Sequence, residues 1–260
     1  QGGGVNAVLK PALDQVSAVD RFRVSAAEDL QLIALLHDKE LDRDLIHALW
    51  QDCYEDFLGV RLQGERSTVA LALLREGLTE IPAELGQATL DQLASDYADI
   101  YLTYGLRASP CESVWLDDDS LTLQEPTFRV RDWYRRHGLT AEDWRMRSED
   151  HLVLELRFLA HLLDGTTEPV DLEEAARFMD EHLLLWIDGF AERVAARCAT
   201  RFYAGLAMLT AAYLDELRDL LAELLDAPRP TREEVEAAVK ACAPSQEVEG
   251  PYLPGAAPSW

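Results

Sequence analysis

The amino-acid sequence predicts an all-α fold, a single bundle of about nine or ten helices. Three observations predict it. Apolar residues recur at intervals of three and four, as they do at Leu152, Leu156, Leu159 and Leu163. No segment alternates apolar and polar residues for long enough to indicate a strand. Capping side chains, glycines and prolines separate the periodic stretches, as they separate helices. Any sheet is therefore expected to be absent or trivial.

Four helices are predicted in the first part of the chain, over residues 26–39, 43–58, 67–75 and 89–104. The first follows a capping box at Ser25-x-x-Glu28, whose side chains would satisfy free amides of the helix start. Asp42 or Asp44 caps the second helix, and Gly77 closes the third.

The longest stretch without helical periodicity covers residues 105–126. A connection of this length inside a helical chain is usually a functional loop, a linker or a hinge. The chain opens with Gln-Gly-Gly-Gly, which is read as an expression scar. The predicted organisation is an N-terminal segment, a helical domain with two possible halves, and a Pro/Gly-rich tail, over residues 1–24, 25–243 (25–104 and 127–243) and 244–260.

The second part of the chain is organised around a helix predicted over residues 148–165. Ser148 is its expected N-cap, and Glu149 and Asp150 would lie in its first turn, where carboxylates favour the positive end of a helix. The other helices expected here begin at a capping residue or an apolar run, at Thr127 (ending at His137-Gly138), Asp171, His182, Phe202 and the capping box Thr231-x-x-Glu234.

Charge and cysteine content narrow the class of protein. The 260 residues carry a formal net charge of −24, which opposes binding to nucleic acids and to anionic membrane surfaces. It favours a basic partner or simply high solubility, which is the commoner reason for a negative surface. The four cysteines form no CxxC pair, so neither a structural zinc site nor a disulfide framework is expected. No apolar run is long enough to span a bilayer and no signal peptide is recognised. We therefore expect a cytoplasmic protein.

Motifs that would indicate an enzyme are missing. The sequence has no GxxxxGK[ST] or GxGxxG loop, no paired Glu-x-x-His motifs and no serine nucleophile elbow. The His37-Asp38 pair suggests an alternative, an all-α metal-dependent phosphohydrolase, but that site also needs an upstream histidine and none precedes His37. We expect no catalytic residues, no cofactor and no metal.

The residues that carry a functional signal follow one another through the middle of the chain. They are Pro110-x-Glu112-Ser113 with Trp115, Tyr134-x-x-x-Gly138, Asp150-His151-Leu152-x-x-Glu155-Leu156-x-Phe158, and then His182 with Trp186. This order resembles the TorD/DmsD/NarJ family of redox-enzyme maturation chaperones over roughly residues 97–225. One departure is Glu149, at a position that is often proline in this family.

The resemblance implies an all-helical cytoplasmic chaperone that is not an enzyme. Such a chaperone binds the twin-arginine signal peptide, the apo catalytic subunit, or both, of a molybdenum oxidoreductase, assists cofactor insertion and prevents premature export. By matching positions, Asp150 and His151 belong to the peptide-binding region, with Glu155 beside them. The client enzyme, guanine-nucleotide binding and the oligomeric state are left open.

A twin-arginine peptide presents two guanidinium groups and then an apolar segment, so its receptor needs carboxylates and an apolar groove. The carboxylates are expected to be Asp150, Glu155 and Glu112. The peptide-binding set predicted from the sequence is Asp150, His151, Glu155, Glu112, Ser113, Trp115 and Tyr134. Asp150→Ala and Glu155→Ala are accordingly expected to weaken binding and leave melting behaviour largely intact.

Simpler structural roles stand beside these assignments. Asp150 could simply be a first-turn residue that stabilises the helix dipole. His151 could be a packed histidine, with Glu155 as its ion-pair partner. Trp115, Trp133, Tyr134 and Trp186 are better explained as core anchors, and Cys111 as a small buried apolar residue. A further hypothesis is an assembly factor that binds a folded partner through the tail after Ala243.

Overall fold

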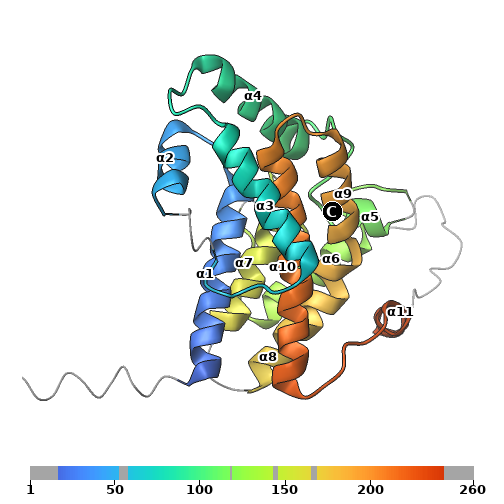
Figure 1. Ribbon diagram of the computed structural model, residues 1–260. Helices are drawn as coiled ribbons and strands as arrows, with labels where there is room; N and C mark the ends of the chain where they lie inside the picture. The colour runs from blue at the N-terminus through green and yellow to red at the C-terminus, as the bar shows by residue number, and fades with distance from the viewer. Residues whose placement is uncertain (1–16, 53–57, 118, 143–145, 165–168, 243–260) are drawn as a thin grey trace, which may run out of the picture. The chain divides into compact units, whose positions relative to one another are not determined.

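The computed structural model describes residues 17–52, 58–117, 119–142, 146–164 and 169–242, and these residues form helices joined by loops (Figure 1). Helices that follow one another without a break count as one, which gives ten helices in the described residues and confirms the predicted fold class. The helices are α1 (Ala18–Asp38), α2 (Arg43–Asp52), α3 (Glu65–Glu80), α4 (Gln87–Tyr97) with the π-helix η1 (Ala98–Leu102), α5 (Ser113–Leu116), α6 (Glu125–Arg136), α7 (Leu152–Asp164), α8 (Pro169–Phe178) with the π-helix η2 (Met179–Leu183) and α9 (Leu184–Arg197), α10 (Arg201–Leu225) and α11 (Arg232–Cys242).

The chain divides into two compact units, residues 1–229 and 230–260. In the second unit, α11 starts with the predicted capping box: the Glu234 amide donates to the Thr231 hydroxyl (3.3 Å), and the Thr231 amide donates to the Glu234 carboxylate (2.8 Å). The predicted domain boundaries stay predictions.

Helix α10 is the element around which the first unit packs. It has its largest contacts with α3 and α9, while α1 packs against α7 (Figure 1). Two glycines let α3 and α10 approach closely: a Cβ at Gly205 would lie 2.5 Å from the Leu74 Cα, and one at Gly77 2.4 Å from the Phe202 amide nitrogen. Gly77 is therefore a buried contact residue inside α3, and the expectation that it ends the helix is wrong.

Several helices begin earlier or later than predicted. Helix α1 starts at Ala18 because Ser17 and Asp20 form the capping box, with the Asp20 amide donating to the Ser17 hydroxyl (3.0 Å), so Ser25 lies inside the helix. Helix α6 starts at Glu125 with Pro126 in its first turn, where a missing N–H costs nothing, and Thr127 is therefore not the cap.

Two more starts differ from the prediction. Helix α8 begins at Pro169, so Asp171 is not its cap. Helix α7 begins at Leu152 rather than after Ser148, because residues 148–151 form a turn in which the His151 amide donates to the Ser148 carbonyl (3.1 Å). Glu149 and Asp150 consequently precede the helix and are not in its first turn.

Other boundaries agree with the sequence. Asp42 caps α2 by accepting the Leu45 amide (2.8 Å), and α6 ends at Arg136, with His137 as its C-cap and Gly138 in the left-handed region (φ 70°). The helix predicted to begin at Phe202 is α10, which begins one residue earlier at Arg201. Some predicted helix and tail residues lie outside the described part of the chain: Cys53, Tyr54, Phe57, Asp143, Gly165 and the tail after Ala243.

The connection over residues 105–126 is less irregular than predicted, because it contains the short helix α5 and the start of α6. Four non-glycine residues in or beside it have positive φ, a conformation that side chains rarely adopt: Tyr104, Arg107, Ser120 and Leu123. No helix in the described part of the chain is long and apolar enough to cross a bilayer.

Candidate functional site

Two segments from the predicted motif lie side by side and share backbone hydrogen bonds. Cys111 and His151 form an isolated antiparallel bridge. On either side of it, the Glu112 amide donates to the Asp150 carbonyl (3.0 Å) and the Leu152 amide to the Pro110 carbonyl (2.8 Å). Cys111 is buried, as expected. The bridge fixes the loop before α5 against the start of α7.

The Asp150 side chain reinforces this junction. Its carboxylate accepts hydrogen bonds from the Ser113 amide (2.8 Å) and from the Ser148 hydroxyl, and the residue is fully buried. Each of these bonds satisfies a polar group that would otherwise be left without a partner. Asp150 therefore holds α5 and the turn before α7 together and does not face solvent.

His151 is the N-cap residue of α7. Its carbonyl accepts the Leu154 and Glu155 amides (2.8 and 3.1 Å), and its Nδ1 accepts the Val153 amide (3.2 Å). Burial, together with the positive charge of Arg147, lowers the His151 pKa to about 3. The imidazole is therefore neutral at physiological pH, with its proton on Nε2, because Nδ1 acts as an acceptor.

A second buried contact joins Glu112 to His182 on η2. The two Glu112 carboxylate oxygens lie 3.1 and 2.9 Å from His182 Nδ1, and both residues are almost completely buried. The Arg129 guanidinium lies 3.7 Å from the same carboxylate. The histidine that the motif places on a later helix thus meets the glutamate of the Glu-Ser pair.

Glu155 lies on the first turn of α7 behind this pair and is fully buried. Its Oε2 accepts a long hydrogen bond from Trp186 Nε1 (3.4 Å), and Oε1 has no hydrogen-bond partner within the described residues. Burial, then the negative charges of Glu112 and Asp150, raise the Glu155 pKa well above its usual range. The surroundings of Glu155 therefore favour the protonated carboxylic acid over the anion.

The aromatic members of the motif surround these groups. Trp115 is half-buried, stacks on Trp186 with ring centroids 6.5 Å apart, and donates Nε1–H to the Ser109 carbonyl (2.8 Å). Tyr134 is buried and donates its hydroxyl to the Glu149 carbonyl (2.9 Å). Trp133, Tyr134 and Trp186 are core residues, as expected.

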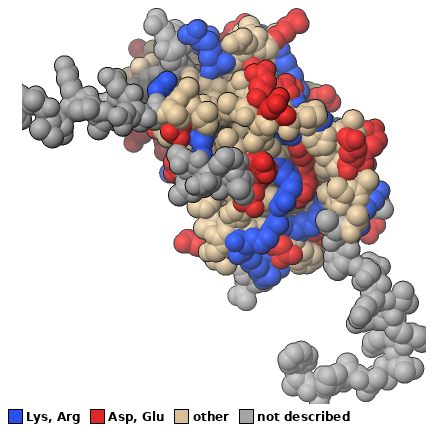
Figure 2. Space-filling view, turned by 90° about the horizontal axis from the view of Figure 1, so that it is seen from below, with Lys and Arg blue, Asp and Glu red and all other residues tan. Residues whose placement is uncertain are grey.

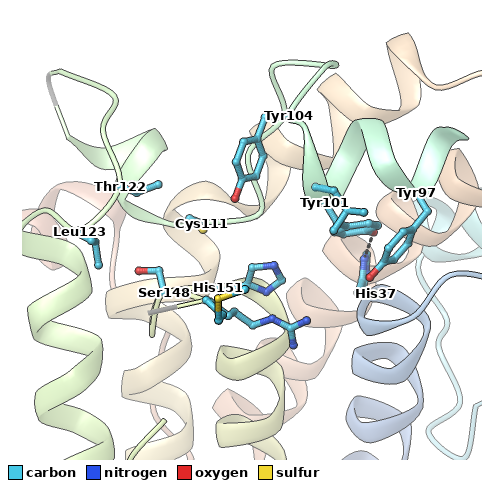
Figure 3. Close-up of a pocket in the computed structure, with 12 residues that line it drawn as sticks. His37, Tyr97, Tyr101, Tyr104, Cys111, Thr122, Leu123, Ser148 and His151 are labelled. Atoms are coloured by element: carbon cyan, nitrogen blue, oxygen red, sulfur yellow. Dashed lines mark hydrogen bonds between the residues drawn. The ribbon is translucent and has the colours of Figure 1, made fainter. Parts of the chain in front are cut away.

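A cavity of about 240 Å³, which we call cavity 1, opens beside the bridge (Figure 3). Tyr97, Tyr101 and Tyr104 from α4, η1 and the following loop line it, and His151 and Cys111 contribute from the bridge. The Arg147 guanidinium also lines the cavity and donates to the Asp38 carboxylate (2.5 Å).

Of the His37-Asp38 pair only His37 lines this cavity, and both residues have other partners. His37 is buried between the Tyr101 hydroxyl (2.5 Å) and the Thr210 hydroxyl (2.8 Å). Asp38 pairs with Arg147 and Arg157, whose bonds and charges lower its pKa although its partial burial opposes the shift. No group of histidine, cysteine and acidic side chains able to hold a metal occurs in the described ranges.

A second cavity of about 700 Å³, cavity 2, shares Leu123 with cavity 1 and extends along α6. Tyr134 lines it, together with Phe128, Leu139, Glu142 and the two arginines Arg131 and Arg135. The ten most exposed large apolar side chains of the described chain include seven in this region: Leu102, Tyr104, Leu121, Leu123, Phe128, Leu139 and Met146. Scattered exposed apolar residues are ordinary, but such a concentration marks an interaction surface.

The structure thus brings together all seven residues of the predicted set, but it turns the three carboxylates inward. Glu112, Asp150 and Glu155 are each fully buried. The sequence-based expectation that they contact the arginines of a bound peptide therefore does not agree with their position. The sequence did not predict cavity 1, because this cavity combines residues from α1, η1 and the loops before and after α6. The available signal was the spacing of Tyr97, Tyr101 and Tyr104, which places three aromatic residues close together on a helical face.

Comparison with known proteins gives matches in the same part of the chain. A family model described as nitrate reductase delta subunit matches residues 66–192, which include every residue of the predicted set. The chain is 31% identical to a protein named chaperone protein TorD from Vibrio cholerae serotype O1 (strain ATCC 39541) over 142 residues, 52% of this chain and 64% of the relative.

Two further relatives extend the match. TorD chaperones from Shewanella pealeana and Shewanella loihica are 27% and 26% identical, over 75% and 77% of this chain and 88% and 93% of their own lengths. The chain therefore spans less than two thirds of the Vibrio protein but most of the two Shewanella proteins.

Proposed function

The chain belongs to the TorD/NarJ family of redox-enzyme maturation chaperones, and from this membership we propose that it is a cytoplasmic, system-specific chaperone. Its ligand would be the twin-arginine signal peptide, the apo catalytic subunit, or both, of one molybdenum oxidoreductase. By binding them, the chaperone would assist cofactor insertion and prevent premature export. The relatives are named as chaperones, which agrees with the prediction that the chain is not an enzyme.

One observation carries this proposal: the family motif lies at two cavities that share Leu123, and exposed apolar side chains such as Leu102, Phe128 and Leu139 stand among their polar lining residues. His151 and Tyr134 each line one of the cavities, and Leu123 lines both. An extended peptide with an apolar segment fits such a groove, because apolar burial supplies affinity at about 25 cal/mol per Å². Micromolar binding needs about 8 kcal/mol, and most of it would come from this contact.

The buried carboxylates then have a supporting role. Asp150 fixes the turn that presents His151, and Glu112 joins the loop before α5 to η2. Because Arg131 and Arg135 also line cavity 2, the arginines of a bound peptide would meet exposed carboxylates at its edge and outside it, such as Glu142 and Asp119 in the loop after α5. An exposed ion pair contributes only about 0–1 kcal/mol, so these contacts would mainly orient the peptide.

The direct test is calorimetric titration of the chain with a synthetic peptide in which an Arg-Arg pair precedes an apolar segment. We expect binding, and we expect Leu123→Ser to weaken it about tenfold, because about 1.4 kcal/mol of apolar contact is lost. Leu224→Ser is the matched control, since Leu224 has a similar exposed fraction (43% against 45%) and lines neither cavity. Absence of binding, or equal loss in both variants, would contradict the proposal.

A further inference from the structure

We propose that cavity 1 receives a neutral part of the bound peptide, a main-chain amide or an uncharged side chain, and excludes its arginines. This inference rests on the proposed function and specifies which chemistry of the peptide occupies which part of the groove. It is carried by the direction of the hydrogen bonds around the cavity and by the charges that line it.

The floor of the cavity offers one hydrogen-bond donor. His151 Nδ1 accepts the Val153 amide, so the ring proton lies on Nε2. The ring lines the cavity, and Figure 3 shows it among the side chains that surround the opening. Nε2–H is therefore the hydrogen-bond donor that His151 can offer to a ligand in cavity 1.

Tyr97 and Tyr101 offer acceptors to the cavity, because both hydroxyl protons are already donated elsewhere. The Thr210 hydroxyl donates to the Leu206 carbonyl (2.8 Å), so its oxygen accepts from His37 Nε2–H. His37 Nδ1 must then accept the Tyr101 hydroxyl proton. The Tyr97 hydroxyl donates to the Asp38 carbonyl (2.8 Å). Both phenol oxygens consequently keep lone pairs and have no proton to give.

The charges at cavity 1 oppose a cation. Arg147 is the one charged side chain among the described residues that line it, and no carboxylate lines it. His37 and His151 are neutral. Asp38 is already shared between two arginines. A guanidinium entering the cavity would lose hydration and meet another guanidinium, whereas a neutral amide finds a donor and two acceptors between aromatic walls.

The first experiment follows the His151 side chain by long-range ¹H–¹⁵N NMR while the chain is titrated with N-acetyl-tyrosinamide or with N-acetyl-argininamide. We expect an Nε2–H tautomer whose signal moves with the neutral probe and not with the arginine probe. An Nδ1–H tautomer, a larger shift with the arginine probe, or no shift with the neutral one would overturn the inference. This result does not depend on leader-peptide binding, so it separates the inference from the proposed function.

The second experiment uses Met146→Glu, which places a carboxylate at the mouth of cavity 1 on a side chain that is 87% exposed. Val24→Glu makes the same charge change on an exposed residue of α1 that does not line the cavity. Affinity is measured for the Arg-Arg peptide and for its Gln-Gln counterpart. We expect Met146→Glu to weaken the Gln-Gln peptide about threefold or more, because the carboxylate stands at the mouth that the neutral group must enter, and Val24→Glu to leave this affinity unchanged. Unchanged affinity of the Gln-Gln peptide for Met146→Glu would refute the proposal.

Discussion

Single residues at the junction of α5 and α7 act by holding backbone segments together. Asp150 accepts a backbone amide from α5 and a hydroxyl from the turn before α7 while it is fully buried. Its replacement would leave the Ser113 amide without a partner, and an orphaned buried donor costs about 1–3 kcal/mol. The structure therefore changes the prediction drawn from sequence, in which Asp150→Ala leaves stability intact.

We expect Asp150→Ala to lower the free energy of unfolding by about 2 kcal/mol in urea denaturation. Asp119→Ala is the control, because Asp119 is exposed in the loop after α5 and its change is expected to stay within about 0.5 kcal/mol. Equal stability of the two variants would argue against the structural role of the Asp150 carboxylate.

The Glu155 carboxylic acid predicts a pH dependence of stability. Its pKa is raised in the folded chain, so its contribution is complete below the unfolded pKa of about 4.5 and is lost as the pH rises through the folded pKa. Glu155→Gln imitates the protonated acid and removes this loss. We expect the variant to gain stability over the natural chain as the pH rises from about 4.5 towards neutrality, at about 1.4 kcal/mol per pH unit while the natural Glu155 stays protonated.

Urea denaturation over that range measures the difference, with the exposed Glu142→Gln as the control. A difference that does not vary with pH would mean that Glu155 is ionised in the folded chain.

At the residue scale, the sequence predicts which residues lie close together, but not whether their side chains point to solvent or into the core. The order of the motif was enough to group Glu112, Asp150, Tyr134 and His182, because the family resemblance fixes their positions along the chain. The direction of a side chain depends on segments distant in sequence. Asp150 faces inward because the amide of Ser113 is there to be satisfied, and spacing along α7 does not contain that information.

At the scale of elements, the contact between α3 and α10 depends on two glycines. A Cβ at Gly205 would lie 2.5 Å from backbone atoms of Leu74, which cannot move aside as a side chain does. We expect Gly205→Ser to destabilise the fold by about 1–3 kcal/mol or more, measured as a lower urea midpoint. Gly86→Ser is the matched change at the N-cap of α4, where a Cβ meets nothing within 4 Å.

Because serine is a good N-cap residue, Gly86→Ser is expected to be neutral or slightly stabilising. Similar losses at the two positions would contradict the close approach of α3 and α10.

Helix existence was predictable and helix starts were less so. The apolar periodicity of α10 and α7 is strong enough to identify both from sequence. Two capping boxes compete at the start of α1, and the outer one at Ser17 prevails because residues between them, such as Arg23, are buried against the rest of the fold. Gly77 carries a local stop signal that packing overrides. Local signals alone do not decide such cases.

At the scale of the whole molecule, the net charge of −24 is not spread evenly. Figure 2 shows lysine and arginine side chains gathered across one face, with acidic side chains around them. Attraction of a basic peptide by the overall negative field is long-range and is screened by salt, with a Debye length of about 8 Å at 0.15 M. The predominance of acidic residues therefore predicts a faster association at low salt.

We expect the association rate of the Arg-Arg peptide to fall at least several-fold between about 0.05 and 0.5 M salt, while the dissociation rate changes less. Stopped-flow fluorescence measures both rates, and the Gln-Gln peptide is the control that lacks the charge. A rate independent of salt would mean that the net charge has no part in recognition.

The central claim, that the chain is a chaperone for one molybdenum oxidoreductase, is tested most directly by capture from the native host. The tagged chain is isolated from the cells and its bound proteins are identified by mass spectrometry, with the Leu123→Ser variant in parallel. The account predicts one molybdoenzyme catalytic subunit with an uncleaved twin-arginine leader, in reduced amount with the variant. Recovery of no such subunit, or of unrelated metabolic enzymes alone, would contradict it.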